Sequence, residues 1–400
     1  MHLGKTCNIH IFYLNHNAFS ISSHAVSPES SGPVSETKRI WQRLFLHCIA
    51  CYNHKENNSL LKNSEYAAYG GENFMEKKYD VIHIGEANHD MRVPGIPAGF
   101  YTGGETTCMC GQVSDGCGGD ALNQAVSLAN LGDHSAFYGK FGSSYPGPRV
   151  MQLLKSQGVD TSLAILSEEC VTPDIICMIE KNGTHRFLVG KRRAWGLKPE
   201  EIRPEVFASA KVLAIGSLYA LNTLDENGAE GLRRILQICR DAGVIVVADM
   251  TIDIASLGPR LYDDIYRYID FMVPSEEEAS FVSGERDEKK MARFFLEKGA
   301  ENVIIKLGSR GSYFLNKEKA FYTDPYDIAP VDTTGCGDNF TAGLIHTLLK
   351  GLPTEECVRF ASAAGALNAL GIGSSSFIRS EQMVLDFMKQ TPLRKIPERS

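Results

Sequence analysis

Several features that mark other classes of protein are missing from this sequence of 400 residues. No apolar run reaches the roughly 20 residues that a membrane-spanning helix needs, and the candidate at residues 40–52 contains Arg43. The net charge is −7 without a basic cluster, so neither nucleic acid nor an anionic membrane is an expected partner. The eleven cysteines lack regular spacing, which favours reduced thiols and a cytoplasmic location. No GxxxxGK[ST] motif occurs, which disfavours a P-loop kinase.

The first 74 residues differ in composition from the rest of the chain. They hold six of the eleven His, no Asp and little sustained periodicity. We expect residues 1–74 to be an N-terminal extension outside the catalytic fold, either poorly ordered or the product of a mis-assigned start, with Met75 as the true first residue. An alternative is a zinc site within residues 47–54, whose His and Cys spacing departs from common zinc fingers.

The most informative segment is Asp332-Thr333-Thr334-Gly335-Cys336-Gly337-Asp338. Small residues at 335–337 allow backbone N–H groups to converge at the start of a predicted helix, where unpaired donors and the helix dipole favour an anion such as phosphate. We predict that Asp338 occupies the first helical position, where its carboxylate could accept a proton from a hydroxyl that attacks phosphorus. The alternative is an ordinary glycine-rich loop with an exposed carboxylate at a helix start.

A second glycine-containing segment, Gly118-Gly119-Asp120-Ala121-Leu122-Asn123-Gln124-Ala125, lies far upstream. Its glycine pair permits close backbone approach to a ligand, and the apolar positions that follow predict a helix buried on one side. A dinucleotide-binding loop is the alternative, but no hydrophobic strand runs directly into residues 116–119.

Together these segments resemble the two signatures of the ribokinase-like (PfkB-type) carbohydrate kinases. The usual C-terminal signature is Asp-Thr-x-Gly-Ala-Gly-Asp, in which Cys336 here replaces Ala and is small enough for the turn. The resemblance covers about residues 78–390 and implies a ribokinase-like α/β fold: a central, mostly parallel sheet flanked by helices on both faces, with a small β-sheet lid. It also implies ATP and Mg²⁺ as cofactors, and a homodimer formed through the lid.

The resemblance assigns roles to residues that match the family's motifs. Its catalytic set is Asp338 as general base, with the backbone N–H groups of Gly335, Cys336 and Gly337 around the transferred phosphoryl group. The sugar-binding set is Asn88, Asp90, Gly118, Gly119, Asp120 and Asn123. The first two follow the predicted strand 81–85, and ligands of open α/β sheets bind outside such strand ends. The alternative for these two is a turn that caps the strand.

A third set of matches implies a nucleotide side. Its members are Ser275, Glu278, Lys306, Gly308, Gly311 and Ser362. Glu278 would organise Mg²⁺ through water, Ser275 stands where the family usually has Asn, and Lys306 stands where Thr is common. The alternative for Glu278 is that it belongs to the solvated first turn of a helix, and the alternative for Lys306 is a side chain that only faces solvent. A monovalent cation such as K⁺ is implied at Asp332, Thr334, Asn368, Gly371 and Gly373.

The hydrophobic pattern predicts alternating strands and helices, as in a parallel sheet. Strands are predicted at residues 81–85, 135–139, 211–216, 244–249, 270–273, 302–307 and 326–331, and helices at 121–132, 228–240, 339–345 and 355–369. Two lid segments, near 91–115 and 170–190, contain short strands predicted at 91–97, 106–113, 174–179 and 185–189, with a turn at Asn182-Gly183. A kinase domain at 75–390 and a C-terminal tail at 391–400 follow.

The predicted activity is ATP-dependent phosphorylation of a hydroxyl on a small carbohydrate. A nucleoside kinase of the same fold is an alternative, and Asp120, where ribokinases usually have Lys, argues against ribose itself. A catalytically silent regulatory relative is a further alternative. The retained Asp338, Glu278 and both glycine segments favour an enzyme.

Overall fold

The computed structural model describes residues 77–396, except for residues 105, 182–184, 191–195 and 376. The predicted N-terminal extension, the zinc alternative, Met75 and the Asn182-Gly183 turn therefore lie outside the described residues.

An eight-stranded sheet forms the centre of the described domain, in the order β14-β13-β12-β11-β10-β9-β1-β4. Its strands are β1 (Tyr79–Gly85), β4 (Ser135–Phe137), β9 (Ala210–Leu218), β10 (Ile245–Met250), β11 (Phe271–Met272), β12 (Asn302–Lys306), β13 (Ser312–Asn316) and β14 (Ala320–Thr323). The strands from β4 to β12 pair in parallel, and β13 and β14 add an antiparallel edge. The predicted mostly parallel sheet is confirmed.

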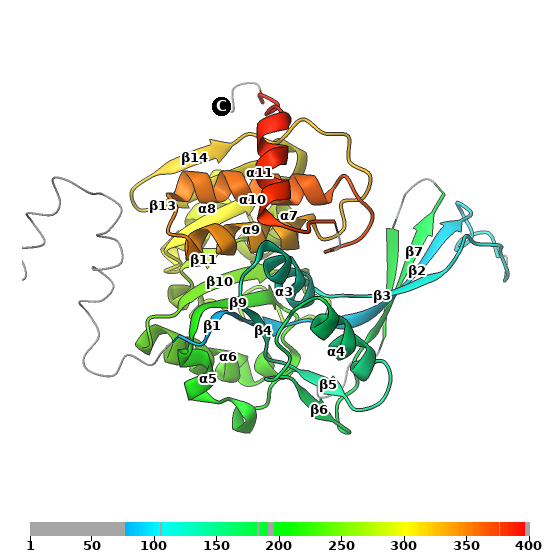
Figure 1. Cartoon of the computed structure of the whole chain (residues 1–400), viewed down its shortest axis with the longest axis horizontal. Coiled ribbons are helices and arrows are strands. Elements are labelled where there is room, and N and C mark those ends of the chain that lie inside the picture. Colours follow the sequence, from blue (N-terminus) through cyan, green and yellow to red (C-terminus); the bar gives the residue numbers. More distant parts are fainter. Residues whose placement is uncertain (1–76, 105, 182–184, 191–195, 376, 397–400) are drawn as a thin grey trace, which may run out of the picture. The chain divides into compact units, whose positions relative to one another are not determined.

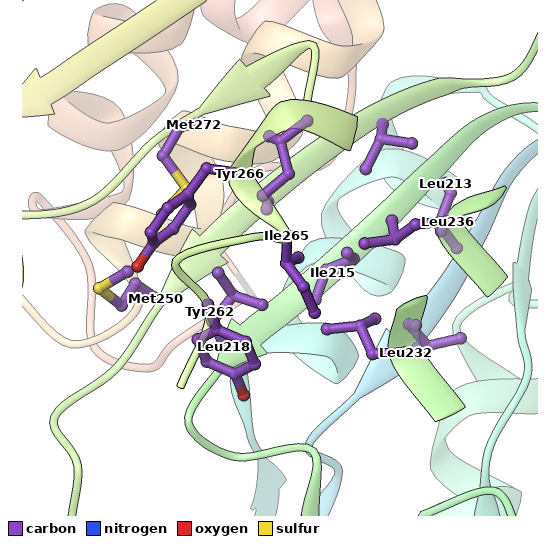
Figure 2. Close-up of a cluster of buried hydrophobic side chains, with 14 of the residues drawn as sticks. Leu213, Ile215, Leu218, Leu232, Leu236, Met250, Tyr262, Ile265, Tyr266 and Met272 are labelled. Carbon is purple, nitrogen blue, oxygen red and sulfur yellow. The ribbon is translucent and has the colours of Figure 1, made fainter. Parts of the chain in front are cut away.

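Helices cover both faces of this sheet because consecutive residues of its central strands are apolar, so that each face needs cover from water. Leu213 and Ile215 of β9 pack with Leu232 and Leu236 of α6 on one face (Figure 2). Val212 and Ala214 of the same strand belong to the opposite core, with side chains of α9 and α10. The helices are α3 (Asp120–Leu131), α4 (Gly147–Ser156), α5 (Pro204–Ala208), α6 (Glu226–Asp241), α7 (Glu276–Ser283), α8 (Glu288–Glu297), α9 (Cys336–Leu349), α10 (Thr354–Asn368) and α11 (Glu381–Gln390).

A smaller sheet in the order β3-β2-β7-β8 forms the predicted lid, and its strands β2, β3 and β7 extend away from the helices in Figure 1. Its strands are β2 (Asn88–Ile96), β3 (Ser114–Gly118), β7 (Asp174–Glu180) and β8 (His185–Val189), and a separate pair is formed by β5 (Lys140–Gly142) and β6 (Ile165–Ser167). The strand predicted at 106–113 is wrong, because the pairing with β2 begins at residue 114. No helix in the described ranges has the length and apolarity to cross a bilayer.

The strand predicted at 326–331 is also wrong, apart from one bridging residue. Tyr326 pairs with Leu393, and the N–H of Asp327 donates to Pro392 O at 2.9 Å. Pro330 has no N–H to offer a ladder. The backbone of this loop therefore bonds to the segment predicted as a tail, whose described part, up to residue 396, packs on the domain.

Candidate active site

A cavity of about 590 Å³ opens where the C-terminal ends of β10 and β12 meet the start of α9 and one face of α10. Ligands of open α/β sheets bind at such strand ends. The cavity is lined by many of the predicted site residues, namely Asp120, Ser275, Glu278, Lys306, Gly308, Gly311, Gly335, Cys336, Gly337, Asp338 and Ser362. The fold therefore gathers segments that are far apart in the sequence into one site.

Asp338 lies at the third helical position of α9, not the first, since the helix begins two residues earlier. Its side chain is buried, and Asn123 Nδ2 donates a hydrogen bond of 2.7 Å to its Oδ2. The hydroxyl of Ser374 donates to Asn123 Oδ1 at 2.8 Å. Burial, and then the carboxylates of Asp120 and Asp249, raise the pKa of Asp338 well above the ordinary aspartate value. The site thus holds its carboxylate in one orientation and makes it a good proton acceptor.

The turn before α9 presents backbone N–H groups at the cavity wall. Gly335 caps the helix in the left-handed conformation, with a φ of 74°. The N–H of Cys336 donates to Thr333 O at 3.2 Å, so it closes the turn, contrary to the predicted role. Within the described ranges, the N–H groups of Gly335, Gly337 and Asp338 donate to no protein acceptor. These three groups are the donors available to an anion.

Lys306 forms a buried ion pair that was not predicted from the sequence. Its Nζ lies 2.7 and 2.8 Å from the two carboxylate oxygens of Asp249. The same Nζ would lie 3.2 Å from a Cβ added to Gly337, so the ammonium also sits beside the glycine turn. Burial by itself lowers the pKa of Lys306, but Asp249 and Glu278 outweigh it and the pKa is raised. The available signal for Asp249 was its place at the C-terminal end of the predicted strand 244–249.

Ser275 and Glu278 form a capping box at the start of α7. The Glu278 carboxylate accepts from Ser275 N at 2.7 Å, and Ser275 Oγ accepts from Glu278 N at 3.4 Å. Burial raises the pKa of Glu278 to about 7. Both residues also line the cavity, so the structural role at the helix start and a place in the site occur together.

The residues predicted to bind sugar meet at the base of the lid. Asn88 and Asp90 begin β2, and Asn88 Nδ2 donates to Asp90 Oδ1 at 2.6 Å. A Cβ on Gly118 would lie 2.1 Å from Asp90 Oδ2, and one on Gly119 would lie 2.7 Å from Asn88 Oδ1, so only glycine fits at either position. Burial raises the pKa of Asp90 to about 6. Asp120, the next residue, lines the cavity.

His89, which was not predicted, fastens the lid strands together. Its buried ring places Nδ1 2.9 Å from Asp174 Oδ1 and Nε2 3.2 Å from Asp115 Oδ2. Tyr145 Oη lies 3.0 Å from Nε2. The ring therefore links β2 to β3 and β7 between the two predicted sugar ligands. No local sequence pattern marks this role, because each partner comes from a different segment.

Another part of the cavity wall, which includes Gly311 and Ser362, consists mostly of uncharged residues. Ser362 Oγ is buried and has no hydrogen-bond partner within the described ranges. Gly311 adopts a φ of 85°, and a Cβ there would lie 2.0 Å from Thr323 O.

Arg394 also lines the cavity, and its backbone N–H bonds to Pro325 O at 2.8 Å. Arg394 was missed because residues 391–400 were assigned to a tail.

The five residues predicted for a monovalent cation lie together, but N–H donors already meet oxygens of four of them, Asp332, Thr334, Asn368 and Gly373. Asp332 Oδ1 and Oδ2 accept from the backbone N–H groups of Thr334 and Gly373. Asn368 Nδ2 donates to Thr334 O and Gly373 O, and Gly371 N donates to Asn368 O. Within the described ranges, no group of three or more His, Cys, Asp or Glu residues is arranged to hold a metal ion. As arranged, these residues do not fit a cation.

Comparison with known proteins agrees with the geometry of the site. Residues 78–380 match the pfkB family of carbohydrate kinases. The chain belongs to this family. Ribokinase from Haemophilus influenzae is 28% identical over 321 residues, which are 79% of this chain and 99% of the relative. The 2-dehydro-3-deoxygluconokinase of Bacillus subtilis is 27% identical over 285 residues, which are 69% of this chain and 87% of the relative.

A solved structure extends the likeness of this pfkB-family chain to three dimensions. Arabidopsis thaliana ribokinase, solved with ribose and ATP, has a TM-score of 0.66 and 23% identity, with 79% of this chain and 99% of that chain covered. The ribokinase-like α/β fold is thus confirmed, and so is the predicted enzyme class, a phosphotransferase that acts on an alcohol group.

Proposed function

We propose that this chain transfers the γ-phosphoryl group of ATP to a hydroxyl of a small carbohydrate, with Asp338 as the general base. The observation that carries the proposal is the position of this carboxylate. It lines the cavity in the first turn of α9, beside N–H groups that have no protein acceptor in the described ranges. A base and an anion site are therefore adjacent.

The residues around Asp338 would act on different parts of the reaction. Asn123 holds the carboxylate toward the attacking hydroxyl, whose proton it accepts. The N–H groups of Gly337 and Asp338 and the ammonium of Lys306 stabilise the negative charge on the transferred phosphoryl group. Because these donors are held by the fold before substrate binds, little reorganisation is needed during the reaction.

The nucleotide would lie along α10 and the β12–β13 turn, where Ser362, Gly308 and Gly311 line the cavity. Mg²⁺ supplies charge neutralisation of the nucleotide phosphates when it is bound. The carboxylate of Glu278 lines the cavity, where it would accept a hydrogen bond from a water molecule bound to Mg²⁺. Because burial raises the pKa of Glu278 to about 7, its carboxyl group is partly protonated near neutral pH, and an approaching cation would favour loss of that proton.

The acceptor would bind between the lid and the start of α3. Asn88 and Asp90 offer an amide and a carboxyl group to sugar hydroxyls, and the glycine pair allows close backbone approach. Closure of the lid would exclude water, which otherwise competes for the phosphoryl group.

We also propose a homodimer through the lid. The edge strand β8 leaves Phe187, Leu188 and Val189 more than two-fifths exposed, at 56%, 55% and 44%. Exposed apolar side chains on an edge strand offer a surface on which the lid of a second copy could pack. Light scattering of the full chain should give the mass of a dimer, and Phe187→Lys should give a monomer. A wild-type monomer at every concentration would contradict this assembly.

The activity is tested by acceptor-dependent ADP release from the full chain with ATP and Mg²⁺. The panel contains ribose, fructose, 2-dehydro-3-deoxygluconate and a set of nucleosides. We expect a carbohydrate to raise ADP release far above the rate with water alone. Release with nucleosides only would support a nucleoside kinase instead, and no acceptor-dependent release with any of the compounds would support a silent relative.

A further inference from the structure

Asn368 occupies the space between two loops that the family resemblance assigns to a monovalent cation. It is the last residue of α10, and its side chain is fully buried. Its Nδ2 lies 3.0 Å from Thr334 O and 3.4 Å from Gly373 O. These are the carbonyl oxygens of the loop before α9 and the loop after α10, so one amide group bridges both.

The same two loops are also joined by a carboxylate. Asp332 Oδ1 accepts from Thr334 N at 2.9 Å, and Oδ2 accepts from Gly373 N at 3.1 Å. A bound cation would need oxygen atoms on all sides and no N–H group among them. Here an amide NH₂ group lies between the two carbonyl oxygens, and the partial positive charge on its hydrogens repels a cation.

We propose that the side-chain amide of Asn368 takes the place of a structural monovalent cation, so that neither folding nor turnover of this protein requires K⁺. The amide holds the loop that carries the glycine turn against the loop after α10, as a cation would, but through hydrogen bonds. The turnover part rests on the proposed kinase function, whereas the folding part is independent of it.

The opposite orientation of the Asn368 amide would give a different set of contacts. Asn368 Oδ1 is buried and has no hydrogen-bond partner within the described ranges. Rotation of the amide by half a turn would direct Oδ1 at Thr334 O and Gly373 O, and three oxygens would then face one another. A bound cation would stabilise that cluster. The two orientations therefore predict opposite responses to K⁺.

Thermal unfolding of the full chain, without ATP or sugar, separates the two. Scans in the chlorides of K⁺, Na⁺ and tetramethylammonium at one ionic strength should give the same Tm for the wild type. Turnover with the best acceptor should likewise be unchanged when tetramethylammonium replaces K⁺. A wild-type Tm that rises specifically with K⁺ concentration would overturn the proposal, since it shows a bound cation.

The variant Asn368→Ala should show a response to K⁺ that the wild type lacks. Removal of the amide opens the space between the two carbonyls, so the variant should lose Tm in tetramethylammonium and regain it as K⁺ is added. Asn130→Ala is the matched control, because Asn130 Nδ2 also ties a loop carbonyl, Ile378 O, at 3.1 Å. Its loss of Tm should be equal in all three salts. An equal loss for Asn368→Ala in all three salts would also contradict the proposal.

If Asn368→Ala does not fold, the wild-type scans still decide the question. If no compound in the acceptor panel is phosphorylated, the kinase proposal fails while the unfolding comparison stands.

Discussion

At the scale of single residues, the site is a set of buried charges that depend on one another. Burial raises the pKa values of Asp338 and Glu278, and the ammonium of Lys306 opposes part of this rise. Since only the ionised Asp338 can accept a proton, turnover should fall as the pH drops through a value above the ordinary aspartate range. The sequence predicted these three residues individually. It did not predict their pairing, because Asp249 and Lys306 meet only after β10 and β12 take their places on either side of β11.

Lys306→Met should separate the stabilising role of this ion pair from its electrostatic role. Removing one partner of a buried pair typically costs about 3–5 kcal/mol, so the single variant should lose much of its thermal stability. The double variant Lys306→Met/Asp249→Leu should recover much of that stability, because neither member of this pair is left in the core without the other. Its kcat should remain low, since the phosphoryl site has lost its positive neighbour. A double variant with wild-type kcat would show that Lys306 has no part in turnover.

Asp90→Asn should stabilise the protein at neutral pH while it weakens acceptor binding. The folded-state pKa of Asp90 is raised from 3.8 to about 6. The protonated form is therefore favoured in the fold, and its contribution to stability is present below pH 4 and lost as the pH rises through about 6. A shift of this size lowers the free energy of unfolding by about 1–3 kcal/mol at pH values above that range. Chemical denaturation below pH 4 and at neutral pH measures the effect on stability, and the acceptor KM measures the effect on binding. A gain at low pH, but none at neutral pH, would contradict this account.

At the scale of elements, hydrophobic periodicity predicted the strands and helices that are buried, and it failed where loops are held by distant segments. The strands 81–85, 211–216 and 244–249 were close to their final bounds. The strand predicted at 326–331 is a loop, because its backbone bonds to residues 392 and 393 rather than to the sheet. Such pairing with the end of the chain leaves no local pattern.

This pairing gives the C-terminal segment a role in nucleotide binding. Arg394 lines the cavity, and its guanidinium donates one hydrogen bond to Ser309 O, so the guanidinium is held at the cavity with its positive charge beside the proposed nucleotide site. Arg394→Ala should raise the KM for ATP several-fold, on the order of 1 kcal/mol of binding, and leave the acceptor KM unchanged. Lys395→Ala, at the next exposed position, is the control. An equal effect of both variants would indicate a general charge effect and not a contact by Arg394.

At the scale of the whole molecule, the central claim is that α3 and α9 bring an acceptor site and a phosphoryl site together. The two glycine segments predicted each helix start, and the parallel sheet predicted that strand ends would gather at one edge. The hydrogen bond from Asn123 to Asp338 joins the two segments. It could not be predicted, because it depends on how closely α3 and α9 pack. The contacts by which His89 links the lid strands could not be predicted for the same reason, since the partners of its ring come from three other segments.

Asp338→Asn tests this claim most directly, with kcat for the best acceptor and the Kd for ATP measured on the same preparation. The change keeps the size of the side chain and removes the proton acceptor. A positioned base typically contributes about 10²–10⁴-fold, so kcat should fall by that factor while the Kd for ATP stays unchanged. Asp241→Asn, at an exposed position at the end of α6, should match the wild type in both. Wild-type kcat in Asp338→Asn would contradict the account.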